Sequence, residues 1–154
     1  MSSLPNGMAR RGGGFTLLEL LVVLAIIATL VAVVAPSIFR NVGDAKTAAA
    51  KSQIEIFGLA LDAYRIDNDT YPTTDQGLAA LRVKPTTGAA PKNWRGPYIR
   101  KDVPLDPWGH AYVYVAPGLA NPTSYDLYTL GRDGKIGGGD EDSDLTSWGG
   151  PVHQ

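Results

Sequence analysis

The chain has 154 residues and carries 14 basic against 15 acidic side chains, so its formal net charge is −1. That balance excludes the basic surface with which nucleic-acid-binding proteins neutralise phosphates, and we expect no nucleic-acid partner. There is no cysteine, which excludes disulfide bonds and thiolate metal sites.

The N-terminal region joins a basic, glycine-rich stretch to a long apolar segment. Arg10 and Arg11 precede three glycines, and the segment 15–35 contains a single charge. At about 1.5 Å per residue, this segment can cross a hydrocarbon core of about 30 Å. It is longer than the apolar region of a cleaved secretory signal, which has about 7–15 residues. We therefore expect a membrane helix with a cytoplasmic N-terminus and an exported C-terminal part.

The single charge in that segment is Glu19. An ionisable side chain at membrane depth costs roughly 2.5–3.5 kcal/mol on insertion scales, so it predicts a functional site with a specific partner.

Helical periodicity continues beyond the apolar segment. Pro36 lacks an amide hydrogen, so we expect a kink or local melting near residues 32–36. From there on, apolar and small residues recur at alternating steps of three and four, which predicts an amphipathic half, 36–66, whose apolar stripe packs on a domain. One long helix from Phe15 to about Ile66 is the expected result. The stripe consists of Ile38, Val42, Ala45, Ala49, Ser52, Ile56, Leu59 and Ala63.

The remaining residues, 67–154, predict a small globular part. Thr73 and Gln76 have the spacing of a capping box, which opens a short helix over about 74–82. Alternating apolar and polar residues at both ends of the segment 111–130 predict an antiparallel β-hairpin. A sheet this small needs a further surface to cover one face, and the stripe of the long helix supplies it. The predicted fold class is therefore α+β.

An acidic, glycine-rich loop covers residues 131–147. Glycines allow a backbone to bend so that several oxygens converge, and calcium takes about six to eight oxygen ligands. An EF-hand is excluded, because Leu145 stands where its glycine is required and Pro151 where its bidentate glutamate is required. A calcium site of another kind and a solvated acidic turn both remain open. The acids of the loop are Asp133, Asp140, Glu141, Asp142 and Asp144.

Nothing in the sequence predicts an enzyme. The two histidines, His110 and His153, have no partner at metal-ligand spacing, and no nucleophile stands out among the serines. A membrane-anchored binding domain remains an alternative at this point.

Several motifs resemble a known family. The junction that resembles the leader site of type IV pilins and pseudopilins reads Gly14-Phe15-Thr16-Leu17-Leu18-Glu19. Later blocks resemble the major pseudopilin of type II secretion systems, the G-type protein of the general secretion pathway. These blocks are Tyr71–Leu81, Gly96-Pro97-Tyr98, Asp106-Pro107-Trp108-Gly109 and Tyr125–Gly134.

The resemblance implies a pilin-like fold and a filament subunit. A prepilin peptidase would cut after Gly14, removing the cytoplasmic leader 1–14, and would methylate the new amino group of Phe15. Glu19 would pair with that amino group in a neighbouring subunit, so that two charges in lipid neutralise each other on assembly. The protein would then span the bacterial inner membrane once and assemble into a periplasmic pseudopilus that drives folded proteins across the outer membrane. The implied partners are membrane lipid, further copies of the chain, minor pseudopilins, the prepilin peptidase and the inner-membrane assembly platform.

The resemblance also implies calcium in the C-terminal loop. The side chains of Asp133 and Asp144 and the carbonyl of Leu130 match the ligand positions of the family, and the roles of Asp140 and Asp142 stay open. Other possibilities are a type IV pilus subunit, a minor pseudopilin or a membrane-anchored calcium-binding domain.

Overall fold

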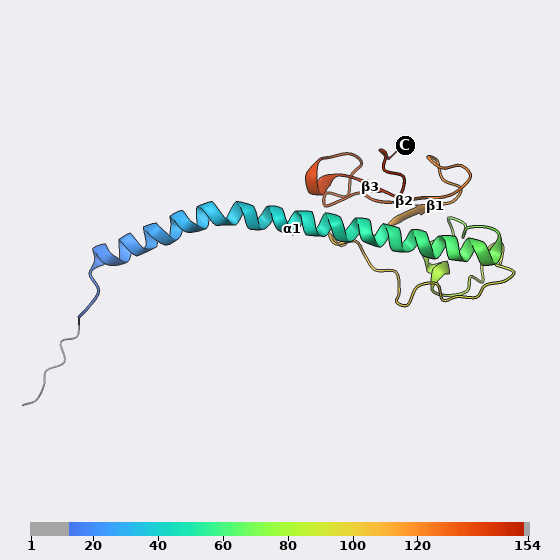
Figure 1. Ribbon diagram of the computed structural model, residues 1–154, viewed down its shortest axis with the longest axis horizontal. Coiled ribbons are helices and arrows are strands. Elements are labelled where there is room, and N and C mark those ends of the chain that lie inside the picture. Colours follow the sequence, from blue (N-terminus) through green and yellow to red (C-terminus); the bar gives the residue numbers. More distant parts are fainter. Residues whose placement is uncertain (1–12, 153–154) are drawn as a thin grey trace, which may run out of the picture. The chain divides into compact units, whose positions relative to one another are not determined.

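The computed structural model describes residues 13–152; the leader residues 1–12, with Arg10 and Arg11, and the tail with His153 lie outside the described residues. Two compact units are present, Met1–Phe39 and Arg40–Gln154. One long helix, α1 (Leu17–Asn68), begins in the first unit and ends in the second (Figure 1). The second unit adds a small antiparallel sheet, so the fold is α+β as predicted.

The described part of the first unit is dominated by the apolar half of α1. A window of 18 residues has a mean hydropathy of 3.0, and none of it is buried within the protein. By length and composition it can cross a membrane. The helix is unbroken through Pro36, so the local melting expected at residues 32–36 is not observed.

Helix α1 is shifted by two residues at each end from the predicted span. It begins at Leu17 because the hydroxyl oxygen of Thr16 accepts a hydrogen bond from the amide of Glu19 at 3.2 Å, which caps the first turn. It ends at Asn68 because Asp69 has a φ of 65°. A residue in this left-handed conformation commonly terminates a helix.

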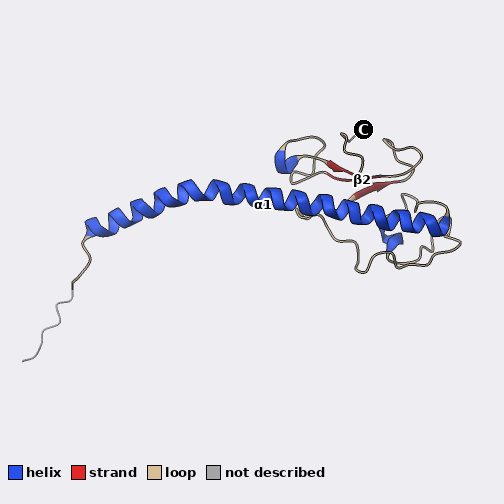
Figure 2. Cartoon of the chain, viewed as in Figure 1, coloured by secondary structure: helices blue, strands red, loops and turns tan. Residues whose placement is uncertain are grey.

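The sheet of the second unit has the order β1-β2-β3 and is antiparallel throughout (Figure 2). Its strands are β1 (Val113–Val115), β2 (Asp126–Thr129) and β3 (Leu145–Thr146). The first two form a hairpin within the predicted range 111–130, with Tyr114 opposite Leu127. The sequence did not predict β3, because two residues are too few for an alternating pattern.

The predicted capping box is present. The amide of Gln76 donates to the Thr73 hydroxyl at 3.3 Å, and the amide of Thr73 donates to Gln76 Oε1 at 3.1 Å. The short helix expected over 74–82 is a turn followed by the 3₁₀-helix η1 (Leu78–Leu81).

The prediction of the buried face of α1 was wrong. The predicted stripe is exposed except for the half-buried Ala63: Val42 is 50%, Ile56 49% and Leu59 73% accessible. A second apolar face, at the same steps of three and four, packs in the core instead because it carries the bulky rings of Phe57 and Tyr64, which fill the space under the sheet. This buried face consists of Ala50, Ile54, Phe57, Leu61 and Tyr64, and it joins Leu81, Tyr112, Tyr114, Leu127 and Leu145 in one core.

Candidate functional site

The N-terminal junction is an open segment that leads into α1. Residues 13–16 precede the helix without regular structure, and a side chain on Gly13 or Gly14 would meet nothing within 4 Å. Phe15 is 86% exposed. The predicted cleavage position therefore has free space around it, as an endopeptidase substrate requires.

Glu19 lies in the first turn of α1, where an acidic side chain is favoured by the positive end of the helix dipole. With Thr16 it has the spacing of a capping box, which the sequence reading overlooked. Within residues 13–152 its carboxylate forms no ion pair. The carboxylate is exposed on an apolar helix and can accept a partner from another chain.

The acidic loop is held closed at its two ends. The amide of Arg132 donates to the carbonyl of Glu141 at 2.8 Å. Gly131 has a φ of 66°, and a Cβ there would lie 2.7 Å from the Glu141 carbonyl oxygen and 2.8 Å from that of Ser143. Only glycine permits both this backbone conformation and this close approach.

Two carboxylates of the loop accept hydrogen bonds from backbone amides in the same short segment, 135–137. Asp133 Oδ1 accepts from the amide of Lys135 at 3.0 Å, and Asp144 Oδ2 accepts from the amide of Gly137 at 2.8 Å. The second oxygen of Asp144, Oδ1, is buried and has no hydrogen-bond donor. A buried acceptor without a partner costs about 1–3 kcal/mol, so it indicates a further ligand such as a cation.

The other predicted calcium ligands, Asp142, Asp140 and Leu130, do not share this backbone stretch. Asp142 makes two 2.9 Å hydrogen bonds with Nε and the terminal nitrogen of Arg132, and these bonds raise the pKa of the guanidinium. Asp140 is exposed at the start of the 3₁₀-helix η2 (Asp140–Asp142), and Leu130 directly follows β2. Across residues 13–152, no three acidic or histidine side chains converge as a metal cluster. A calcium site here would therefore need backbone carbonyls in addition to carboxylates.

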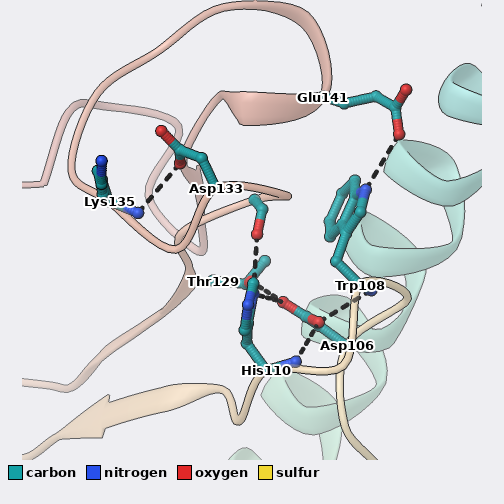
Figure 3. Close-up of polar contacts among 8 residues, drawn as sticks. Asp106, Trp108, His110, Thr129, Asp133, Lys135 and Glu141 are labelled. Atoms are coloured by element: carbon teal, nitrogen blue, oxygen red, sulfur yellow. Dashed lines mark hydrogen bonds and ion pairs between the residues drawn. The ribbon is translucent and has the colours of Figure 1, made fainter.

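A rigid turn supports the loop from below (Figure 3). Asp106 is buried, and its Oδ1 accepts from the amides of Trp108 at 3.0 Å and His110 at 2.8 Å. Its Oδ2 accepts from the hydroxyl of Thr129, the last residue of β2. His110 Nδ1 lies 3.0 Å from the carbonyl oxygen of Gly131 and donates to it, because a carbonyl only accepts. The turn thus fixes both the end of β2 and the start of the acidic loop.

The sequence analysis assigned no role to Glu141 of the loop or to Gly43 of α1. In the structure the side chain of Glu141 packs against Gly43. A Cβ on Gly43 would lie 2.6 Å from Glu141 Oε1, and Glu141 Oε2 accepts from Trp108 Nε1 at 3.1 Å. Two signals were available. Glu141 is the only glutamate in the loop, and a glycine inside a helix costs roughly 0.5–1 kcal/mol relative to alanine.

Comparisons with known proteins are consistent along nearly the whole chain. The family described as "Type II secretion system (T2SS), protein G" matches residues 37–148, and the "Prokaryotic N-terminal methylation motif" matches residues 9–35. The chain is 47% identical over 139 residues to the type II secretion system core protein G of Pseudomonas aeruginosa, which covers 90% of this chain and 96% of the relative. It is 44% identical over 140 residues to the protein of the same name from Vibrio cholerae, covering 90% and 93% respectively.

A solved structure of a major pseudopilin is also similar to this chain. The crystal structure of the major pseudopilin from the type 2 secretion system of enterohaemorrhagic Escherichia coli matches with a TM-score of 0.59 at 38% identity. The match covers 70% of this chain and 90% of that chain.

Proposed function

The chain belongs to the protein G family of the type II secretion system, and we propose that it is the major subunit of a pseudopilus, polymerising through α1 to move folded proteins across the outer membrane. Members of the family are structural subunits, and the chain assembles with other components of the secretion system. The observation that carries the proposal is the uncovered apolar helix, with a mean hydropathy of 3.0 and no burial within the protein. Such a surface needs lipid or other helices around it.

Processing would create the positively charged partner that Glu19 lacks. Cleavage after Gly14 leaves an amino group on Phe15, and the methylation motif matches this region. In a membrane, the amino group of one subunit and the Glu19 carboxylate of its neighbour would each be costly alone. Their pairing makes assembly favourable, because removing one partner of a buried ion pair leaves an uncompensated charge.

The exported half of α1 would continue the same packing. The face with Val42, Ile56 and Leu59 is exposed in the single chain, although its residues recur at helical spacing. Packing of neighbouring subunits would cover this face at about 25 cal/mol per Å² of apolar surface. In this arrangement the sheet and the loops would lie on the outside of the filament, in the periplasm.

Calcium would order the acidic loop. Asp133, Asp144 and the carbonyl of Leu130 would hold it, and Asp144 Oδ1 is the buried oxygen that needs a positive partner. Calcium would supply charge neutralisation to a loop whose five acids face only Arg132 and Lys135. Asp142 is engaged by Arg132 and is the weakest candidate ligand.

The further partners are also part of the proposal. A prepilin peptidase would process the chain, an inner-membrane platform would assemble it, and minor pseudopilins would accompany it in the filament. The protein would span the inner membrane once, with the N-terminus cytoplasmic before processing.

The test replaces Glu19 by glutamine in the full chain, produced in a host with an active secretion system. We expect the isolated membrane form to begin at Phe15 with one added methyl group, by intact mass, while pseudopilus yield and secretion are lost. Glu55→Gln is the matched control, because it removes the same charge from an exposed position of α1. Normal filaments from Glu19→Gln would contradict the charge-pairing mechanism. An unprocessed wild-type chain would leave a membrane-anchored domain as the better interpretation.

A further inference from the structure

The side chain of Glu141 leaves the acidic loop and lies against α1. Its Oε1, Cδ and Cγ would be 2.6, 2.7 and 2.8 Å from a Cβ on Gly43, so a side chain at residue 43 would displace Glu141 from this position. Gly43 is buried, whereas both of its neighbours in α1 are exposed. Since its φ is not positive, backbone conformation does not require glycine here. The close approach of Glu141 is the constraint on residue 43 that the structure shows.

Both carboxylate oxygens of Glu141 have partners. Oε2 accepts from Trp108 Nε1 at 3.1 Å, and Oε1 lies 3.6 Å from Arg132. The backbone carbonyl of Glu141 accepts from the Arg132 amide at 2.8 Å. Glu141 thus connects α1, the turn before β1 and both ends of the acidic loop. Its side chain is three-quarters buried, and both of its carboxylate oxygens are engaged by other residues of the chain.

We propose that Glu141 is a positioning residue that fastens the acidic loop to α1 at Gly43 and thereby sets the affinity of the loop for calcium. The inference rests on the calcium site of the proposed function and assigns Glu141 no contact with the ion.

The physical basis is linkage. Asp133 lies near the start of the loop and Asp144 near its end, and they accept from the amides of Lys135 and Gly137, two residues apart, so a cation held by both carboxylates requires the closed loop. The contacts of Glu141 hold the same closed loop, because they join its two ends to each other and to Trp108. Two interactions that stabilise the same state strengthen each other. By reciprocity, bound calcium would stabilise the contact between Glu141 and Gly43.

The test titrates calcium chloride into chelator-treated full chain in detergent micelles and measures the dissociation constant by calorimetry. We expect Glu141→Gln and Gly43→Ala to raise the dissociation constant about tenfold, as replacement of groups that orient metal ligands commonly does. The charge-matched control is Asp75→Asn, at an exposed position outside the loop, which leaves the constant unchanged.

A second arm separates coupling from a general loss of structure. In chelator, the midpoint of urea unfolding is measured for Gly43→Ala, Glu141→Ala and the double variant. We expect Gly43→Ala to destabilise the wild type and to be neutral or stabilising in the Glu141→Ala background, since the obstruction is then gone. Unchanged calcium affinity in Glu141→Gln, or additive effects of the two alanines, overturns the inference. Absence of calcium binding by the wild-type chain is a different result, because it removes the calcium site of the proposed function itself.

Discussion

Replacing Asp106 by alanine is expected to destabilise the second unit strongly. The Asp106 side chain is completely inaccessible, and it accepts hydrogen bonds from the amides of Trp108 and His110 and from the Thr129 hydroxyl. Each hydrogen bond to a charged group contributes about 1.5–3 kcal/mol. Water can reach some of the abandoned donors, so we expect a loss of about 3–5 kcal/mol in the free energy of unfolding. That is a large part of the roughly 5–15 kcal/mol of a whole domain.

The assay is urea unfolding of the full chain in nonionic micelles, followed by tryptophan fluorescence. All three tryptophans, Trp94, Trp108 and Trp148, belong to the second unit, so the signal reports that unit alone. With a slope of roughly 1–3 kcal/mol per M urea, the expected loss lowers the midpoint by about 2 M.

Asp106→Asn distinguishes lost acceptors from lost charge. Its amide oxygen can still accept from the two backbone amides, and its NH₂ can donate to Thr129, whose hydroxyl also accepts. We expect a loss of only about 1–2 kcal/mol for this variant. The reasoning is refuted if Asp106→Ala unfolds at the same urea concentration as an alanine at the exposed Asp75, or if the asparagine variant is as unstable as the alanine variant.

Three further outcomes are expected. Leu59→Lys changes the free energy of unfolding by less than about 0.5 kcal/mol, because Leu59 is 73% exposed. The same variant lowers filament yield. Unimpaired filaments would exclude the helix face with Leu59 from assembly. Phe57→Ala, two residues away and 1% exposed, loses about 3–5 kcal/mol in the same urea assay, and a loss near zero would contradict the described core. Burial raises the pKa of Tyr112 and of Tyr125 from 10.0 to about 12. Their contribution to the free energy of unfolding is therefore present below pH 10 and is lost as the pH rises towards 12. A urea midpoint that stays constant between pH 10 and pH 12 would show that these rings are not buried.

Local features of the fold could be predicted from the sequence. The apolar run, the capping box at Thr73 and Gln76 and the alternation around Tyr112 and Tyr114 depend on residues close together in the chain. The structure has these elements where local chemistry predicts them, within a few residues. The family resemblance was likewise sufficient to identify the chain, because its motifs extend over most of its length.

Contacts between distant residues could not be predicted. The meeting of Gly43 with Glu141 joins positions about a hundred residues apart, and neither residue has a periodic pattern around it. Spacing alone likewise could not separate Asp142 from Asp144, and only the family resemblance favoured Asp144 as a ligand. The structure distinguishes them by one long-range fact: Arg132 reaches Asp142 and leaves Asp144 Oδ1 without a donor.

The wrong prediction for α1 has a physical cause that bears on function. Two apolar faces satisfy the same helical spacing in the exported half of the helix, and periodicity cannot say which one the domain covers. The domain covers the face with Phe57 and Leu61, and the face with Ile56 and Leu59 remains exposed. A helix that is apolar on both sides is one that is buried on both sides in its working state. A single chain covers only one of these two faces. In the proposed filament of identical subunits, a neighbouring copy would cover the second face at every step.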